Sequence, residues 1–264
     1  MTNHTRGALV SLLALLVLSA LMFGRPSRSL AQSGSPGPSA TPLTSTSSSS
    51  DNQGRLIFLG DCAFCHGANA TGTNRGPSLQ GVGDASVDFF LSTGRMPVTE
   101  EVQDPQRKAP AYDSAEIAGI VSYVSSLGAG SGPPIPDVNL ASASLTEGEK
   151  LYTENCASCH SSVGSGGALT SGFYAPTLRP STSTQIAEAI RVGPGTMPLF
   201  GTDTLTTDQV NSIARYVLYL QHPEDRGGFA SGHIGPITEG MIAFVFGLGT
   251  LIVVVRKIGT TVDD

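Results

Sequence analysis

Residues 54–66, GRLIFLGDCAFCH, recur with a constant offset as GEKLYTENCASCH at residues 148–160. Both stretches end in Cys-x-x-Cys-His, and together they hold all four cysteines of the 264-residue chain. Each repeat ends in a segment, 113–127 in the first and 206–220 in the second, in which apolar residues recur at helical spacing. A capping-box pair stands at the start of each segment. This repeated order predicts an all-α fold with two duplicated small domains.

The Cys-x-x-Cys-His pattern is the attachment signature of c-type haem. Two thiols three positions apart on a helical turn reach the two vinyl groups of one porphyrin, and the adjacent histidine is delivered to the iron. The cysteines predicted to bind haem covalently are Cys62, Cys65, Cys156 and Cys159. The histidines predicted as axial iron ligands are His66 and His160. The pattern therefore predicts two haem c groups.

Other uses of the cysteines are disulfides, redox dithiols and a zinc site. A thioredoxin-like dithiol needs a βαβ context, which this sequence lacks. A zinc site needs four close ligands, whereas the two cysteine pairs are far apart in the chain. Two complete copies of the haem signature favour haem attachment over these three alternatives.

Two methionines occupy equivalent places in the repeat. Met96 lies in GRMP at 94–97, and Met197 lies in GTMP at 195–198. A methionine in a loop commonly fills a core, but the matched positions favour thioether ligation of both irons. Histidine–methionine ligation raises the reduction potential of a haem. Two occupied axial positions favour electron transfer and argue against a dihaem peroxidase.

The composition divides the chain into segments. Residues 1–31 contain an apolar stretch that predicts a cleaved signal peptide or an N-terminal membrane helix, and both interpretations imply export of the haem domains. Residues 32–53, rich in Ser, Thr and Pro, predict a disordered tether. The two haem domains are expected at 54–128 and 145–226, joined by a Gly- and Pro-rich linker at 129–144.

Residues 234–257 are long and apolar enough to predict a transmembrane helix. Arg256 and Lys257 close this segment, as expected of a cytoplasmic end. The prediction places residues 258–264 in the cytoplasm as a tail, and the haem domains on the extracytoplasmic side of the cell membrane. The net charge is −6 and no basic block is present, so nucleic acid is excluded as a partner.

Beyond the haem signature, the sequence resembles the dihaem cytochrome c subunit of the actinobacterial-type cytochrome bcc complex, a menaquinol–cytochrome c reductase. In the first domain the resemblance rests on CAFCHGAN (62–69), RGPSLQGVG (75–83), STGRMP (92–97) and RKAP (107–110). In the second half it rests on NCASCH (155–160), GGALTSGFYAPTL (166–178), MPLF (197–200) and GHIGPITEGM (232–241).

The resemblance implies two tandem class I cytochrome c-like domains in an electron-transfer subunit. It implies that the first haem accepts electrons from a Rieske iron–sulfur protein beside a cytochrome b subunit, and that the second passes them to a haem-copper oxidase. It also implies that the carbonyls of Pro77 and Pro176 orient the rings of His66 and His160. The chain alone would be a carrier, and an oxidoreductase only within its complex. The alternative is a membrane-anchored dihaem carrier, either for a dehydrogenase or as a tethered shuttle.

Overall fold

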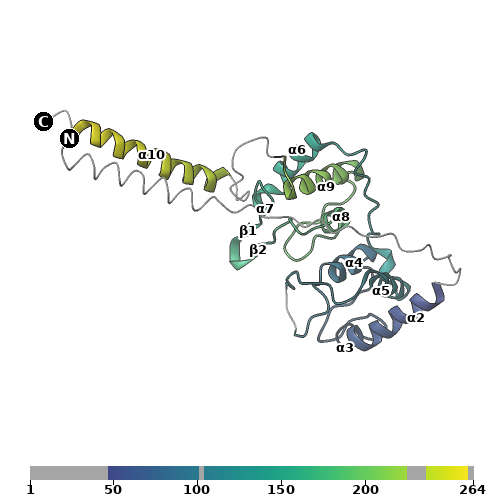
Figure 1. Ribbon diagram of the computed structural model, residues 1–264. Helices are drawn as coiled ribbons and strands as arrows, with labels where there is room; N and C mark the ends of the chain where they lie inside the picture. Colours follow the sequence, from purple (N-terminus) through teal and green to yellow (C-terminus); the bar gives the residue numbers. More distant parts are fainter. Residues whose placement is uncertain (1–46, 101–103, 225–235, 261–264) are drawn as a thin grey trace, which may run out of the picture. The chain divides into compact units, whose positions relative to one another are not determined.

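The structure is a computed structural model that describes residues 47–100, 104–224 and 236–260 (Figure 1). It is mostly helical, with two small helical domains and one apolar helix near the C-terminus. The predicted signal or anchor segment at 1–31, and residues 32–46 of the predicted tether, lie outside the described residues.

The first domain consists of short helices joined by loops. Its elements are α2 (Ser47–Ile57), the π-helix η1 (Phe58–Cys62), α3 (Ala63–His66), α4 (Asp84–Ser92), α5 (Ser114–Ser126) and the 3₁₀ helix η2 (Ala129–Ser131). The capping box expected for α5 is present, because Asp113 accepts the backbone N–H of Glu116 while the Glu116 carboxylate accepts the N–H of Asp113. The start of α5 is therefore encoded locally.

The second domain repeats the order of the four α-helices, without counterparts of η1 and η2 and with a short hairpin added after α7. Its elements are α6 (Leu145–Asn155), α7 (Ala157–His160), β1 (Gly167–Ala168), the 3₁₀ helix η3 (Thr170–Gly172), β2 (Tyr174–Ala175), α8 (Ser183–Val192) and α9 (Thr207–Gln221). The capping box predicted for α9 is present between Thr206 and Gln209. The antiparallel β1–β2 pair is a departure from the all-α prediction. Gly166 and Gly172 flank its strands with positive φ, which allows the sharp turns of this hairpin.

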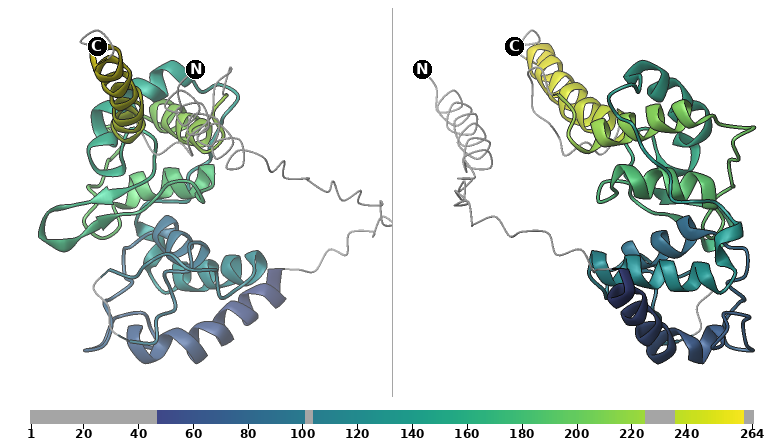
Figure 2. Two further views of the ribbon diagram at one scale, coloured as in Figure 1. Left: turned by 60° about the vertical axis from the view of Figure 1, so that its left-hand side comes forward. Right: turned by 90° about the vertical axis from the view of Figure 1, so that its right-hand side faces the viewer.

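A close helix crossing defines each domain. Helix α2 packs against α5, and α6 packs against α9 (Figures 1 and 2). At the crossings lie Gly54 and Gly148, the first residues of the two repeated stretches. A Cβ at Gly54 would overlap the carbonyl oxygen of Gly119, and one at Gly148 would overlap that of Ser212. The repeat therefore carries glycine where two helix backbones touch.

An aromatic pair accompanies each crossing. The ring centroids of Phe58 and Tyr123 lie 5.5 Å apart, edge to face, and those of Tyr152 and Tyr216 lie 5.4 Å apart. Phe58 and Tyr152 occupy equivalent positions of the repeat and are each only 1% exposed. These pairs fix the depth at which the helix leading into each Cys-x-x-Cys-His turn is buried.

The structure revises three predicted boundaries. Residues 47–53, predicted as tether, are helical in α2, since a helix anchored by packing downstream extends by one hydrogen bond per residue. The 129–144 linker is partly ordered: Ala129 is buried in the first core, and Val138 packs against the second. Residues 258–260, predicted as part of the tail, continue the last helix, and residues 261–264 are outside the described part.

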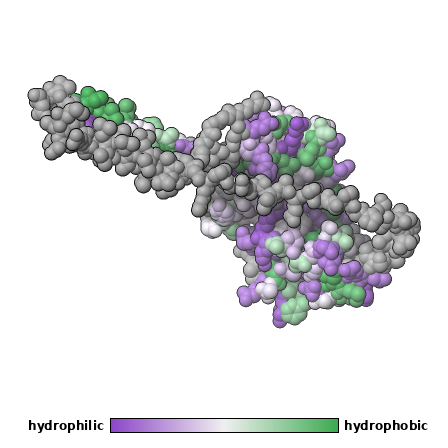
Figure 3. Space-filling view, viewed as in Figure 1, coloured by the Kyte–Doolittle hydropathy of each residue, from purple (hydrophilic) through white to green (hydrophobic). Residues whose placement is uncertain are grey.

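The last helix, α10 (Pro236–Thr260), contains a stretch long and apolar enough to span a membrane, Glu239–Gly259. None of that stretch is buried, and its hydrophobic surface is visible in Figure 3. An isolated apolar helix exposed in this way is costly in water but not in a bilayer. The observation supports the transmembrane prediction for the part of 234–257 that the structure describes.

One buried acid lies where the two domains meet. Glu188 of α8 is fully buried, and both of its carboxyl oxygens are removed from solvent. Helix α8 contacts α4, which carries Asp88. Burial raises the pKa of Glu188 to about 9, and Asp88 adds to the shift through its negative charge and through a side-chain hydrogen bond. Glu188 is therefore protonated near neutral pH.

The crossings yield a first prediction. Gly54→Ala or Gly148→Ala should lower the free energy of unfolding by roughly 1–3 kcal/mol or more, because each methyl group forces two helix backbones apart. The measurement is denaturant or thermal unfolding. Gly60→Ala is the matched control, since a Cβ at Gly60 meets nothing within 4 Å. Equal effects at positions 54 and 60 would contradict the prediction.

Glu188 yields a second prediction. Its pKa is raised in the folded chain from the ordinary value of 4.5, so the folded state holds a proton that the unfolded state has lost. Stability should be highest below pH 4.5 with respect to this group and fall as pH rises toward 9. Glu188→Gln should flatten that decline and raise stability at pH 8, on the order of a few kcal/mol. Melting curves from pH 5 to 8 measure this, with the exposed Glu154→Gln as control. A parallel decline in both variants would exclude Glu188 as its source.

Candidate haem-binding sites

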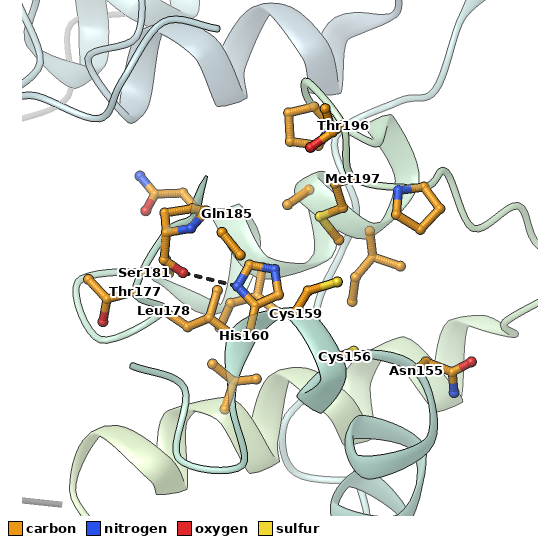
Figure 4. A pocket seen from close by; sticks show the side chains of 18 of the residues that line it. Asn155, Cys156, Cys159, His160, Thr177, Leu178, Ser181, Gln185, Thr196 and Met197 are labelled. Atoms are coloured by element: carbon orange, nitrogen blue, oxygen red, sulfur yellow. Dashed lines mark hydrogen bonds between the residues drawn. The ribbon is translucent and has the colours of Figure 1, made fainter. Parts of the chain in front are cut away.

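The second domain encloses a cavity of about 270 Å³. Cys156, Cys159 and His160 reach it from the turn at α7, and Met197 reaches it from the loop after α8. His160 and Met197 lie on facing sides of this cavity (Figure 4). Helix α9 contributes Ile213 and Val217 to a lining that is otherwise largely carbon. The cavity therefore has a histidine on one side, a methionine on the other and mainly apolar walls between them.

The first domain has an equivalent cavity of about 400 Å³. Cys62, Cys65 and His66 line it from the turn at α3, and Met96 lines it from the loop after α4. Its volume falls within the roughly 300–1,000 Å³ of typical ligand pockets. The structure therefore brings together, in two separate sets, all eight cysteine, histidine and methionine residues selected from the sequence.

Both histidine rings are held by a proline carbonyl. The Nδ1 atom of His66 lies 2.8 Å from the carbonyl oxygen of Pro77. The Nδ1 atom of His160, whose ring is labelled in Figure 4, lies 3.0 Å from the carbonyl oxygen of Pro176. A carbonyl only accepts, so Nδ1 carries the proton and Nε2 keeps its lone pair for a metal. Burial lowers the pKa of His160, with partial opposition from the Pro176 carbonyl. These contacts are the arrangement that orients an imidazole ligand.

The four cysteines are free thiols in both sites. Burial raises the pKa of Cys62 to about 11, with added repulsion from Asp61 and Cys65. Burial likewise raises the pKa of Cys156 to about 11, aided by Cys159. Thiols of this kind stay protonated at neutral pH and are unsuited to thiolate redox exchange. In the described part of the chain, no three His, Cys, Asp or Glu side chains gather as a metal cluster.

The residues present fit a covalently attached haem. Each cavity is lined by two thiols and a histidine from one Cys-x-x-Cys-His turn and by a methionine from a separate loop, and each histidine keeps its Nε2 free. The iron of such a haem would be held by the histidine nitrogen and the methionine sulfur. The porphyrin would add apolar surface to a domain core that is too small to be stable without it. The same donor set suits neither a structural zinc site nor a disulfide framework.

Sequence reasoning missed the residues that line both cavities, which are Arg95, Asp104 and Pro194. It also missed a polar contact between the domains. Gln185 accepts from Arg107 Nη2 at 2.7 Å, and its Nε2 donates to the Ser92 carbonyl at 3.2 Å. One signal was available for Arg95, because the second repeat has Thr196 where the first has arginine.

Charge is concentrated at this junction. The guanidinium of Arg95 lies 4.8 Å from the ring centroid of Phe89 and is 8% exposed. Burial lowers the pKa of Arg95, nearby Arg107 lowers it further, and Asp104 opposes the shift. Arg107 and Asp104 therefore act electrostatically on Arg95, and Arg95 and Asp104 line both cavities.

Comparisons with known proteins define the class first. A cytochrome c family model matches residues 52–128, and the model of cbb3-type cytochrome c oxidase subunit III matches residues 143–217. Two cytochrome c domains with two Cys-x-x-Cys-His turns make the chain a dihaem c-type cytochrome that binds two haem c groups covalently. The prediction of two haem c cofactors is confirmed.

Curated relatives then define the family. The chain is 39% identical over 222 residues to the cytochrome bc1 complex cytochrome c subunit of Mycobacterium bovis, covering 81% of this chain and 79% of the relative. It is 36% identical over 226 residues to the subunit of that name from Corynebacterium diphtheriae, covering 79% and 80%. The chain belongs to this family of cytochrome bc1 complex cytochrome c subunits.

More distant matches exist as well. The cbb3-type cytochrome c oxidase subunit CcoP of Rhodobacter capsulatus is 30% identical over 192 residues, covering 63% of this chain and 61% of the relative. A solved structure, the reducing HAO-like protein complex of Kuenenia stuttgartiensis, aligns with a TM-score of 0.34 at 16% identity, covering 64% of this chain and 95% of that one. The resemblance to a reductase subunit is confirmed by the nearer relatives.

Proposed function

We propose that this chain carries electrons from a Rieske iron–sulfur protein, bound beside cytochrome b, through its two haems to a terminal haem-copper oxidase. Family membership supports an electron-transfer role in a bc1-type oxidoreductase complex. The observation that carries the proposal is the pair of matched His/Met cavities in one chain, with lining residues in common. A bound haem c supplies a one-electron iron couple.

The chain's own residues set the conditions for that role. We assign Cys62, Cys65, Cys156 and Cys159 to the thioether bonds. We assign His66 and Met96 as iron ligands in the domain predicted at 54–128, and His160 and Met197 in the domain predicted at 145–226. With a histidine and a methionine both holding the iron, neither site would leave an open position for peroxide or oxygen. Pro77 and Pro176 hold the imidazoles in one tautomer, so little reorganisation accompanies a change of charge.

The topology follows from α10. We propose that the haem domains lie on the extracytoplasmic side and that Arg256 and Lys257 mark the cytoplasmic end of the membrane helix. This arrangement ties both haem domains to the membrane where a quinol-oxidising partner and an oxidase would work. The exposed apolar surface of Glu239–Gly259 supports membrane anchoring.

The ligand assignment gives a third prediction. Met96→His should lower the reduction potential of the first haem, and Met197→His that of the second, because histidine stabilises ferric iron more than a thioether does. We expect at least a tenfold change in the reduction equilibrium, about 59 mV for one electron. Redox titration with optical detection measures it, and each variant serves as the control for the other. Unchanged reduction potentials in both variants would contradict the assignment of Met96 and Met197 as iron ligands.

A fourth prediction tests the partners. Purification of the tagged chain from native membranes in mild detergent should recover cytochrome b, a Rieske protein and copper-oxidase subunits. A chain ending at residue 224 serves as the control and should be held less firmly by the membrane, because it lacks α10. Recovery of a dehydrogenase instead, or of the full chain alone, would contradict the proposed relay and leave a general dihaem carrier.

A further inference from the structure

The two cavities adjoin at a single buried arginine. Arg95 precedes Met96 in the first domain, yet it lines the cavity of the second domain as well as its own. The equivalent residue of the second repeat is Thr196, so the second domain supplies no matching cation from its own loop. The Arg95 side chain therefore lines both predicted haem sites. The two repeats differ at this position.

Arg95 has an unused hydrogen-bond donor. Its Nη1 atom is buried and has no acceptor among the residues that the structure describes. A buried guanidinium N–H without an acceptor is costly, on the order of 1–3 kcal/mol or more. The Phe89 ring offers its π face but no oxygen acceptor. The site therefore calls for a negatively charged acceptor that is not supplied by the described protein groups.

The neighbouring charges leave Arg95 available for such an acceptor. Arg107 is already engaged across the domain junction: its Nη2 donates to the Pro180 carbonyl at 2.8 Å and to Gln185 at 2.7 Å. Asp104 is the one acidic residue that lines both cavities within the described chain. Among the described residues, no carboxylate is hydrogen-bonded to Nη1 of Arg95, so the positive charge at this atom has no direct partner. A carboxylate inside the cavity would balance it.

Haem itself carries such carboxylates, its two propionates. We propose that Arg95 donates from Nη1 to a propionate of the haem in the first domain, and that its charge raises the reduction potentials of both haems. A guanidinium fork matches a carboxylate in geometry and charge. Because Arg95 is buried and lines both cavities, its positive charge would act on a haem in either cavity with little screening by solvent. Arg95 is a positioning and potential-setting residue for this pair of cofactors.

The test is a redox titration of both haems in the full chain, purified within its native complex, with Arg95→Gln, Arg95→Lys and a control. Arg95→Gln should shift the reduction equilibrium of the first haem at least tenfold toward ferric iron, about 59 mV. The second haem should move in the same direction by a smaller factor. Arg95→Lys should stay within threefold of the unmodified chain, because it keeps the charge.

The matched control is Arg191→Gln. Arg191 is a half-buried arginine whose Nη1 donates to the carbonyls of Phe200 at 3.0 Å and Leu205 at 2.7 Å, and it lines neither cavity. It should leave both potentials within threefold. Unchanged potentials in Arg95→Gln, or a shift equal to that of the control, would overturn the proposal. Because the titration needs no electron donor or acceptor protein, its result is independent of the proposed relay.

A second measurement covers the case in which Arg95→Gln fails to mature. Redox-difference infrared spectra of Arg95→Lys, made with haem ¹³C-labelled at the propionate carboxyls, report the propionate hydrogen bond directly. Replacing a guanidinium donor by an ammonium should shift a labelled carboxylate band. A purely structural arginine, stacked on Phe89 alone, would leave the labelled bands unchanged, and that result would overturn the proposal.

Discussion

The close approach of two helix backbones at Gly54, and again at Gly148, is the constraint on which each domain is built. Only glycine lets α2 meet α5, and α6 meet α9, at that distance. Phe58 and Tyr152 then pack one turn further along against a tyrosine of the partner helix. These contacts direct each Cys-x-x-Cys-His turn toward its cavity. The placement of the haem-binding cysteines and histidines therefore depends on a helix contact in which none of them takes part.

Each cavity is the missing part of a small core. A domain of this size buries too little apolar surface to be robust, and the carbon-rich walls around His66 and His160 are complete only with an apolar group between them. A haem bound in each cavity would therefore both complete the domain core and carry the electron. The carbonyls of Pro77 and Pro176 orient the two imidazoles before a metal is bound.

The junction between the domains is polar rather than apolar. Gln185 caps the start of α8 and also contacts Arg107 and Ser92 of the first domain. Glu188 is buried beside Asp88, and Nη1 of Arg95 is buried without an acceptor among the described residues. Unsatisfied buried groups are rare in stable folds, and they concentrate here where two cofactor sites adjoin. Natural chains keep such groups where a bound group or a protonation state satisfies them.

The sequence by itself determined the repeat, the haem signatures, the matched methionines, the caps of α5 and α9 and the apolar C-terminal helix, because each depends on residues close together in the chain. Local spacing could not reveal the glycine crossings as contacts, the β1–β2 pair, the ordered part of 129–144 or the burial of Glu188. Arg95 is the sharpest case: in sequence it is merely the neighbour of Met96. Only the tertiary structure places it in both cavities, because the packing of α4 against α8 decides which loops share a wall.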